Sequence, residues 1–316
     1  MHIIYREGSL EMERAMKELH GVKIEYHADD FGMFPTQSRR ILDCYRNGCL
    51  NGISVMPNSP WLETTMEEFR PFQKDIAVTV HLNLIEGKSL GGKEQVGLLT
   101  DDNGILRASF FHLLLRSYLP GRKVLRQHLK EEFRLQIAAV QKYLAPEQPV
   151  RLDGHAHYHM IPVAFDALMD VIEEEKLNVS YIRIPREYLS LYLRHKPCRQ
   201  GATAINLVKV GILNLLSLRN QWKYRKILSG LEKKIFMGVF LSGRMDLEHV
   251  APTLADACAL AERRGCGLEI LAHPGGVYEP DDIRQLTHPD DVQFLTSEMR
   301  RKEASLFQIS HEVMKK

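Results

Sequence analysis

The part of the chain that fixes its interpretation is Arg151-Leu152-Asp153-Gly154-His155-Ala156-His157-Tyr158-His159. We predict a short buried strand at Val150–Asp153, so the three histidines at alternate positions would follow the end of a strand. α/β proteins place ligands and catalytic groups at strand ends. A single histidine is usually a buried polar group, but three within five residues favour a metal site. Further ligands must then come from distant parts of the chain.

Polar side chains also follow three other predicted strands. Asp29 and Asp30 come after a stretch that alternates apolar and polar residues, as a strand does. His81 follows a nearly continuous apolar run, and His273 follows the last such run. Taken singly, the two aspartates suit a polar turn or a helix cap, and each histidine suits a buried core position. Together with the cluster after residue 150, they favour one site.

The spacing of strands and helices predicts an α/β fold. About seven strands alternate with helices, which implies a parallel sheet covered by helices, and we expect a distorted TIM-like (β/α) barrel. In a barrel all the strand ends named above converge on one face. There is no Gly-x-Gly-x-x-Gly motif for a dinucleotide. The predicted strands are residues 22–27, 50–56, 76–80, 150–153, 180–185, 235–241 and 268–272.

Composition restricts the class of protein. The 316 residues are 44% hydrophobic and 26% charged, with a formal net charge of +2. Such a balance gives no reason to expect a nucleic-acid partner. The five cysteines form no Cys-x-x-Cys pair, and we find no signal peptide and no apolar run long enough to span a membrane. We expect a cytoplasmic protein, membrane-associated at most, with an N-terminal extension at residues 1–20 and one domain at 21–316.

Residues 186–234 interrupt the alternation of strands and helices. They hold eleven Lys or Arg against two Glu, together with an apolar run around residues 207–218. This basic helical insertion is either a set of solvated helices packed on the barrel or a contact with a membrane surface or an anionic, lipid-bearing substrate.

The Gly- and Asp-rich residues 85–109 form either a lid over the site or a simple connection. Arg183 either faces the site or serves as a structural ion-pair partner.

Four motifs follow one another along the chain: Ala28-Asp29-Asp30-Phe31-Gly32, His81-Leu82-Asn83-Leu84, Asp153-Gly154-His155-Ala156-His157-Tyr158-His159 and His273-Pro274-Gly275. In this order, they resemble the motifs of the YdjC/ChbG family of carbohydrate deacetylases. The resemblance spans about residues 22–276, and the ordered set is more specific than any one motif. It implies a distorted barrel and removal of an acetyl group from an N-acetylated sugar such as a chito-oligosaccharide.

The resemblance also implies roles for individual residues. Asp30, His81 and His155 would bind a divalent metal ion, Asp29 would be the general base and His273 the general acid. The insertion is longer than we expect for family members that act on soluble oligosaccharides, so a lipid-linked acetylamino sugar is a second candidate substrate.

The implied chemistry is consistent with the residue types. One carboxylate and two imidazoles leave open positions on an ion, as catalytic sites require. A bound ion would lower the pKa of a water molecule from about 15.7 towards about 7. Asp153 would hold a histidine in the right tautomer. His157 and His159 would crowd a single ion, so we expect them to support the ligands or to contact substrate.

Alternatives remain at this point. The protein could hydrolyse another amide or ester bond with a metal, or bind a carbohydrate or a membrane surface without turnover. Asp29 and His273 argue against a binding role alone, because binding needs neither a base nor an acid. Mg and Zn are the leading candidates for the metal, although Mn, Co and Ni accept the same ligands. The sequence leaves the oligomeric state open, with a homodimer as one alternative.

Overall fold

The structure is a computed structural model that describes residues 21–284 and 289–308. The extension expected at residues 1–20 lies outside the described residues. At the centre is one sheet of seven strands, and every pairing between neighbouring strands is parallel. The strands are β1 (Ile24–Phe31), β2 (Gly52–Val55), β3 (Ala77–Leu82), β4 (Val150–Gly154), β5 (Val179–Ile182), β6 (Lys234–Met237) and β7 (Gly267–Ala272).

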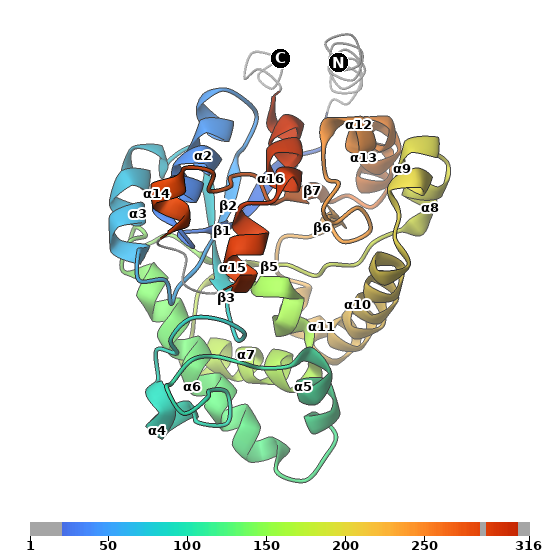
Figure 1. Ribbon diagram of the computed structural model, residues 1–316. Helices are drawn as coiled ribbons and strands as arrows, with labels where there is room; N and C mark the ends of the chain where they lie inside the picture. Colours follow the sequence, from blue (N-terminus) through green and yellow to red (C-terminus); the bar gives the residue numbers. More distant parts are fainter. Residues whose placement is uncertain (1–20, 285–288, 309–316) are drawn as a thin grey trace.

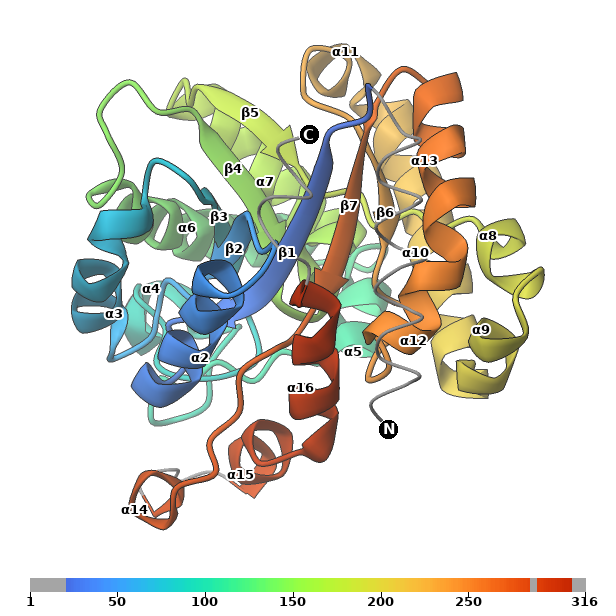
Figure 2. The same ribbon diagram turned by 90° about the horizontal axis from the view of Figure 1, so that it is seen from above.

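The strands lie in the order β5-β4-β3-β2-β1-β7-β6, which follows the sequence around an incomplete circle. The gap falls between β5 and β6. Just before β6, the amide of Glu232 donates to the carbonyl of Ser180 in β5 over 2.9 Å, so the two edges approach at their amino ends. Seen from above, β1 and β7 run side by side at the middle of the curled sheet (Figure 2). The predicted distorted barrel of parallel strands is confirmed.

Helices surround the sheet on its outer side (Figure 1). Those that connect successive strands or cover the sheet are α2 (Pro35–Arg46), α3 (Leu62–Phe69), α6 (Arg122–Gln141), α7 (Pro162–Glu174) and α13 (Leu254–Arg263). The others are α4 (Gly92–Val96), α5 (Phe110–Arg116), α8 (Leu189–Leu193), α9 (Lys196–Gly201), α10 (Ala204–Lys223), α11 (Arg225–Leu228), α12 (Leu247–Val250), α14 (Pro280–Ile283), α15 (Pro289–Leu295) and α16 (Glu298–Glu303).

The main apolar core lies between the sheet and these helices. On α6, the buried residues Leu125, Leu129, Phe133, Ile137 and Val140 recur at intervals of three or four and so form one face of the helix. This face packs against α7 and the sheet. Burial of this face, rather than helix propensity, holds α6 on the barrel.

The interior of the barrel is charged instead. Arg151 Nη2 donates to both oxygens of Glu25, at 2.6 and 2.8 Å, and the Lys234 ammonium also contacts Glu25. Arg183 Nη2 lies 2.8 Å from an oxygen of Glu269. Isolated buried charges are very costly, and here each one has an opposite partner. The interior therefore forms a rigid base beneath the carboxyl ends of the strands.

Several details differ from the sequence-based expectation. The strand expected at residues 235–241 ends at Met237, because Glu187 accepts the amides of residues 238–240 and draws them out of the sheet. Residues 85–109, predicted to form either a lid or a simple connection, have local structure of their own. They contain α4 and two antiparallel bridges, and Glu132 of α6 accepts the amides of Leu90 and Gly91 at 3.0 Å.

The basic insertion at residues 186–234 folds into α8, α9, α10 and α11. On α10, Val210, Leu213 and Asn220 are buried, and the Asn220 side chain donates to the carbonyl of Met160 over 2.9 Å. The helix therefore packs on the barrel, which is one of the two alternatives predicted from the sequence. None of the described helices is long and apolar enough to cross a bilayer.

Candidate active site

Three potential metal ligands meet at the carboxyl ends of β1, β3 and β4. Asp30 Oδ1 lies 3.0 Å from His155 Nδ1 and 3.5 Å from His81 Nε2, and the two imidazole nitrogens lie 3.3 Å apart. Ligand atoms held at about 2.1 Å from one ion in tetrahedral geometry are about 3.4 Å apart. One carboxylate and two imidazoles with this spacing therefore fit a single divalent ion.

A β-bulge turns Asp30 towards this point. Adjacent residues of a strand normally face opposite sides of the sheet, so Asp29 and Asp30 should diverge. The pairing of β1 with β2 shifts register between Ala28 and Phe31, and Asp30 has a left-handed φ of 67°. Gln37 Nε2 donates to the Asp30 carbonyl over 3.0 Å and holds the turn. Strained backbone of this kind occurs often at functional sites.

In each of the three candidate ligands, the polar atom that faces away from the proposed ion contacts another side chain. His81 Nδ1 donates to Asp153 Oδ1 over 2.7 Å, which leaves Nε2 free to bind an ion. His155 Nε2 lies 3.1 Å from Glu86, and Asp30 Oδ2 accepts from Arg300 Nη2 over 3.2 Å. The ligands are thus oriented from behind, as catalytic metal sites usually are.

The electrostatics favour a cation at this point. Burial alone would raise the pKa of Asp30, but its hydrogen bonds to His155 and His81 hold that pKa well below its usual value. Burial would lower the pKa of His81, yet Asp153 and Asp29 outweigh it and raise the pKa to about 10. The carboxylates around His81 thus stabilise a positive charge at this point, which a divalent ion would supply in place of the proton.

Asp29 lies beside this group, fixed by a guanidinium. Arg183 Nη1 donates to both oxygens of Asp29, at 3.0 and 2.9 Å, and it also lies 2.6 Å from Asp153. Asp29 Oδ2 is 3.8 Å from His81 Nε2. Arg183 is fully buried, and its guanidinium bridges three carboxylates of the barrel, including Glu269. Arg183 is therefore an ion-pair partner, and one of its partners is Asp29, which lines the cavity described below.

His273 follows β7, the strand next to β1. Its amide donates to Glu303 over 2.6 Å, and its Nδ1 lies 3.6 Å from the same carboxylate. Burial lowers the pKa of the imidazole, but Glu303, Asp30 and Asp29 together raise that pKa above its ordinary value. The side chain is 26% exposed, so it combines a stabilised positive charge with access to the outside.

His157 and His159 do not point the same way as His155. The strand ends at Gly154, and residues 155–160 form a 3-10 turn in which Ala156 and His157 have left-handed φ angles. His159 Nε2 donates to the Arg183 carbonyl over 2.9 Å, and burial lowers the pKa of its imidazole to about 4. His157 packs edge-on against Phe236, and burial likewise lowers its pKa. Burial thus favours the neutral form of both imidazoles, and neither belongs to the group of ligand atoms formed by Asp30, His81 and His155.

A cavity of about 750 Å³ opens above these groups. Asp29, His155, His157 and His273 line its floor, together with Arg300 and Glu303. Its walls are largely apolar and come from α5, α10, α15 and the residues after β6, including Phe111, Ile212, Val239 and Phe294. A mostly apolar cleft with a few converging polar groups is typical of small-molecule sites.

Two other acidic and histidine clusters occur in the described residues, and both are already neutralised. Glu25, His27 and Glu269 form one, and His27, Asp29 and Asp153 form the other. Arg151 and Lys234 bind Glu25, while Arg183 binds the remaining carboxylates. Cations of the protein thus occupy the space that an ion would need.

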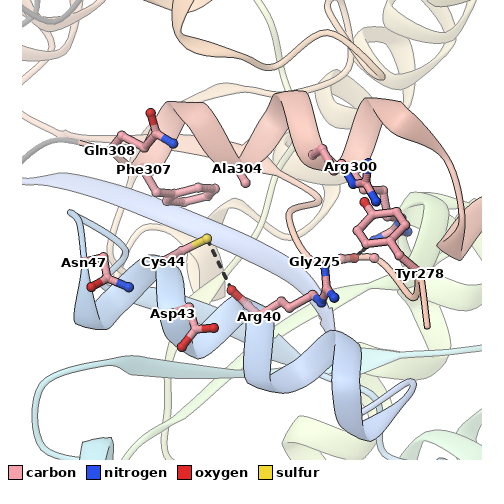
Figure 3. Close-up of a pocket in the computed structure, with 12 residues that line it drawn as sticks. Arg40, Asp43, Cys44, Asn47, Gly275, Tyr278, Arg300, Ala304, Phe307 and Gln308 are labelled. Atoms are coloured by element: carbon pink, nitrogen blue, oxygen red, sulfur yellow. Dashed lines mark hydrogen bonds between the residues drawn. The ribbon is translucent and has the colours of Figure 1, made fainter. Parts of the chain in front are cut away.

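A smaller hollow of about 290 Å³ lies between α2 and α16 (Figure 3). Arg40 and Tyr278 both line it and contact each other, with the guanidinium 4.7 Å from the ring centre. The one thiol there, Cys44, donates to the Arg40 carbonyl, and burial raises its pKa to about 12. This hollow has no activated nucleophile and no metal-ligating cluster among its lining residues, so we place the chemistry in the larger cavity.

Sequence reasoning missed Glu86, Arg300 and Glu303. Arg300 and Glu303 are three residues apart on α16, and both are buried. In the sequence they look like ordinary surface charges of a helix, because nothing local marks their burial. Glu86 follows His81 closely in the sequence, and a carboxylate near a candidate ligand is the signal that could have identified it.

Comparisons with known proteins agree with this picture. A family model described as YdjC-like protein matches residues 23–310. A carbohydrate deacetylase of Danio rerio is 24% identical over 297 residues, which cover 88% of this chain and 90% of that protein. One from Mus musculus is 25% identical, with coverages of 80% and 78%.

A carbohydrate deacetylase of Thermoanaerobacter pseudethanolicus is 24% identical over 51% of this chain, and the match spans only 61% of that protein's length. A solved structure from Enterococcus faecalis V583 is similar with a TM-score of 0.54 and 16% identity, covering 93% of this chain and 98% of that one. That protein is provisionally described as a cellobiose-phosphate cleavage protein. At this identity, the likeness supports the fold alone.

Proposed function

Because the chain belongs to the family of YdjC-like proteins, we propose that it is a metal-dependent hydrolase that removes the acetyl group from an N-acetylated sugar. The relatives named carbohydrate deacetylase, which match over 90% and 78% of their own length, support the reaction class. The observation that carries the proposal is the convergence of Asp30, His81 and His155 within 3.5 Å of one another, with Asp29 and His273 beside them.

In this proposal Asp30, His81 and His155 hold the divalent ion. When bound, the ion would lower the pKa of a water molecule and polarise the acetyl carbonyl. Two imidazoles and one carboxylate suit Zn²⁺ better than Mg²⁺, which prefers oxygen ligands. Asp153, Glu86 and Arg300 keep the ligands in place through the contacts described above.

Asp29 then takes a proton from the attacking water. Arg183 donates to both of its oxygens and so fixes their position beside the metal ligands. The amide nitrogen of the sugar must leave with a proton, and His273 donates it from the neighbouring strand. Glu303, Asp30 and Asp29 raise the pKa of His273, which favours the protonated imidazole that this step requires. The apolar walls of the cavity limit the access of other water molecules to these groups.

The substrate enters the cavity above Asp29. The cavity volume of about 750 Å³ accommodates a short acetylated saccharide. The five cysteines are all free, which supports a reducing compartment such as the cytoplasm.

The test is acetate release from a panel of N-acetylated sugars, including short chito-oligosaccharides. The protein is first stripped of metal and then reloaded with single divalent ions. We expect acetate release that depends on the ion and is strongest with Zn²⁺ or a similar ion. If stoichiometric metal binding occurs without acetate release from any soluble or lipid-linked acceptor, the proposed reaction is wrong, and another amide or ester bond is the next candidate.

A further inference from the structure

Exposed apolar side chains are concentrated on two parts of the molecule. Of the sixteen large apolar side chains exposed in the described residues, eleven lie in residues 111–124 and 205–222. Scattered exposed apolar residues are normal, whereas a concentration of this kind marks an interaction surface. The eleven are Phe111, Leu115, Tyr118, Leu119, Val124, Ile205, Leu207, Val208, Leu215, Leu218 and Trp222.

Helix α10 is apolar on its outer face as well as its inner one. Val208, Leu215 and Trp222 are spaced seven residues apart, which places them on one stripe, and they are 61%, 70% and 73% exposed. Leu218 lies between them on the same side. A surface helix normally presents polar residues opposite its buried face. This outer stripe is therefore built to contact something apolar.

Exposed apolar side chains also occur at the end of α5 and in the turn that follows it. Leu115 of α5 is 59% exposed, and Tyr118 and Leu119 of the turn are 67% and 41% exposed. Phe111 of α5 and Ile212 of α10 line the same cavity, and both helices pack on α7. The two exposed faces therefore flank the cavity, with α5 near α10 in Figure 1. We call the exposed residues Leu115, Tyr118, Leu119, Val208, Leu215, Leu218 and Trp222 the α5–α10 surface.

Positive charge surrounds this surface. Residues 103–130 and 188–231 contain no Asp or Glu but hold fourteen of the chain's 42 Lys and Arg. Some of these cations are paired within the fold, as Arg126 is with Asp170. Exposed Arg122, Lys123, Lys209, Arg225 and Lys226 lie on the same two segments. The protein as a whole carries only +2, so the excess is local.

We propose that the α5–α10 surface docks onto a bilayer containing anionic lipids and that the acetylated sugar is presented to the cavity on a lipid of that bilayer. Docking onto the bilayer is inferred from the α5–α10 surface alone, whereas a lipid-linked substrate rests on the proposed deacetylase function. Apolar side chains enter the boundary between headgroups and acyl chains, and the surrounding Lys and Arg bind anionic headgroups. Docking is peripheral, since none of the described helices can span a bilayer.

Charge complementarity favours a bilayer over a second copy of the chain. Two copies of the α5–α10 surface facing each other would bring two acid-free, basic segments together, and like charges repel. An anionic membrane offers the opposite charge over a broad area. Lys209 belongs to the cavity lining as well as to the basic segment. It is thus placed to meet an anionic group of a lipid-linked substrate.

The first experiment is co-sedimentation of the metal-loaded protein with phosphatidylcholine vesicles, with and without phosphatidylglycerol. We expect binding only to the anionic vesicles, weakened by salt. The double substitutions Leu215→Ser/Trp222→Ser and Leu115→Ser/Tyr118→Ser should each lower the bound fraction by about tenfold. The matched control Leu90→Ser/Leu98→Ser changes exposed leucines on residues 85–109 and should bind as the wild type does.

The variants are then compared in two activity assays. Acetate release from a soluble acetylated sugar should be unchanged in the surface variants, because none of these four side chains lines the cavity. Release from an alkyl N-acetylglucosaminide embedded in anionic vesicles should fall with the bound fraction. The charge variant Arg225→Glu/Lys226→Glu, which leaves the apolar stripe intact, should also reduce vesicle binding.

The outcomes separate docking from the proposed reaction. Equal vesicle binding by the wild type and the surface variants, or no binding at all, overturns the docking proposal. If the protein does not bind vesicles but forms a dimer, and the same substitutions dissociate that dimer, the docking proposal is overturned and the surface binds a second copy of the chain. Vesicle binding as expected with no acetate release from any acceptor supports docking and refutes the deacetylase function. The Asp29→Asn protein should still bind vesicles, since Asp29 lies at the cavity floor.

Discussion

Asp153 Oδ1 accepts a hydrogen bond of 2.7 Å from His81 Nδ1, and this contact turns His81 Nε2 towards Asp30. The two residues are 72 positions apart in the sequence and are paired neighbours in β3 and β4. The parallel register of two adjacent strands therefore selects the tautomer of a candidate ligand.

The first prediction concerns this contact. Asp153→Asn should lower metal affinity by about 10–100-fold, because the amide no longer holds His81 in the required tautomer. Affinity is measured by competition with a chelating indicator. Asp246→Asn is the matched control, since Asp246 makes the same 2.7 Å contact with His249 outside the cavity. Equal affinity of the Asp153→Asn and wild-type proteins would contradict the proposed role of Asp153.

We expect Asp29 to control turnover and Asp30 to control metal binding. Asp29→Asn is expected to lower kcat by about 10²–10⁴-fold while stoichiometric metal binding is kept, because a general base is lost and no ligand is. Asp30→Asn should instead lose the metal. Both proteins are assayed for bound metal and for acetate release. The assignment would be reversed if Asp29→Asn lost the metal and Asp30→Asn retained it.

Substitution of Glu303 should change the pH dependence of kcat. The pKa of His273 is raised by Glu303, so the imidazole stays protonated, and able to donate, to a higher pH. Activity should fall as the pH rises through this pKa. Glu303→Gln removes the negative charge, so the alkaline limb of the pH profile of kcat should shift to lower pH. Asp256→Asn, which removes a carboxylate 3.2 Å from His195 elsewhere on the protein, should leave the profile in place.

Gly154 should tolerate no side chain. A Cβ there would lie 2.7 Å from His159 Nδ1 and 3.0 Å from His159 Cβ, where the histidine is fully buried. Gly154→Ala should therefore lower the free energy of unfolding by about 1–3 kcal/mol. The control Gly211→Ala adds a Cβ in open space within α10 and should raise stability by about 0.5–1 kcal/mol. Denaturant unfolding measures both, and an unchanged Gly154→Ala protein would refute the packing argument.

The sequence alone determined the alternation of strands and helices and the residues that follow each strand. Both signals are local, because apolar periodicity reports which face of an element is buried. Parallel strands bring their carboxyl ends to one edge, so Asp29, Asp30, His81, His155 and His273 were predicted to converge. The structure places all five there, and it places the basic insertion on the barrel as helices.

Only the tertiary structure decided how these residues are held. Arg183 reaches Asp29 across 154 positions and Arg300 reaches Asp30 across 270, so no local pattern could have revealed either pair. The bulge at Asp30 and the turn after Gly154 changed the direction of side chains that simple strand alternation would have placed otherwise. The wall formed by α10 likewise depends on packing. Periodicity indicates that a face is buried, but the partner of that face follows from the folded arrangement of the whole chain.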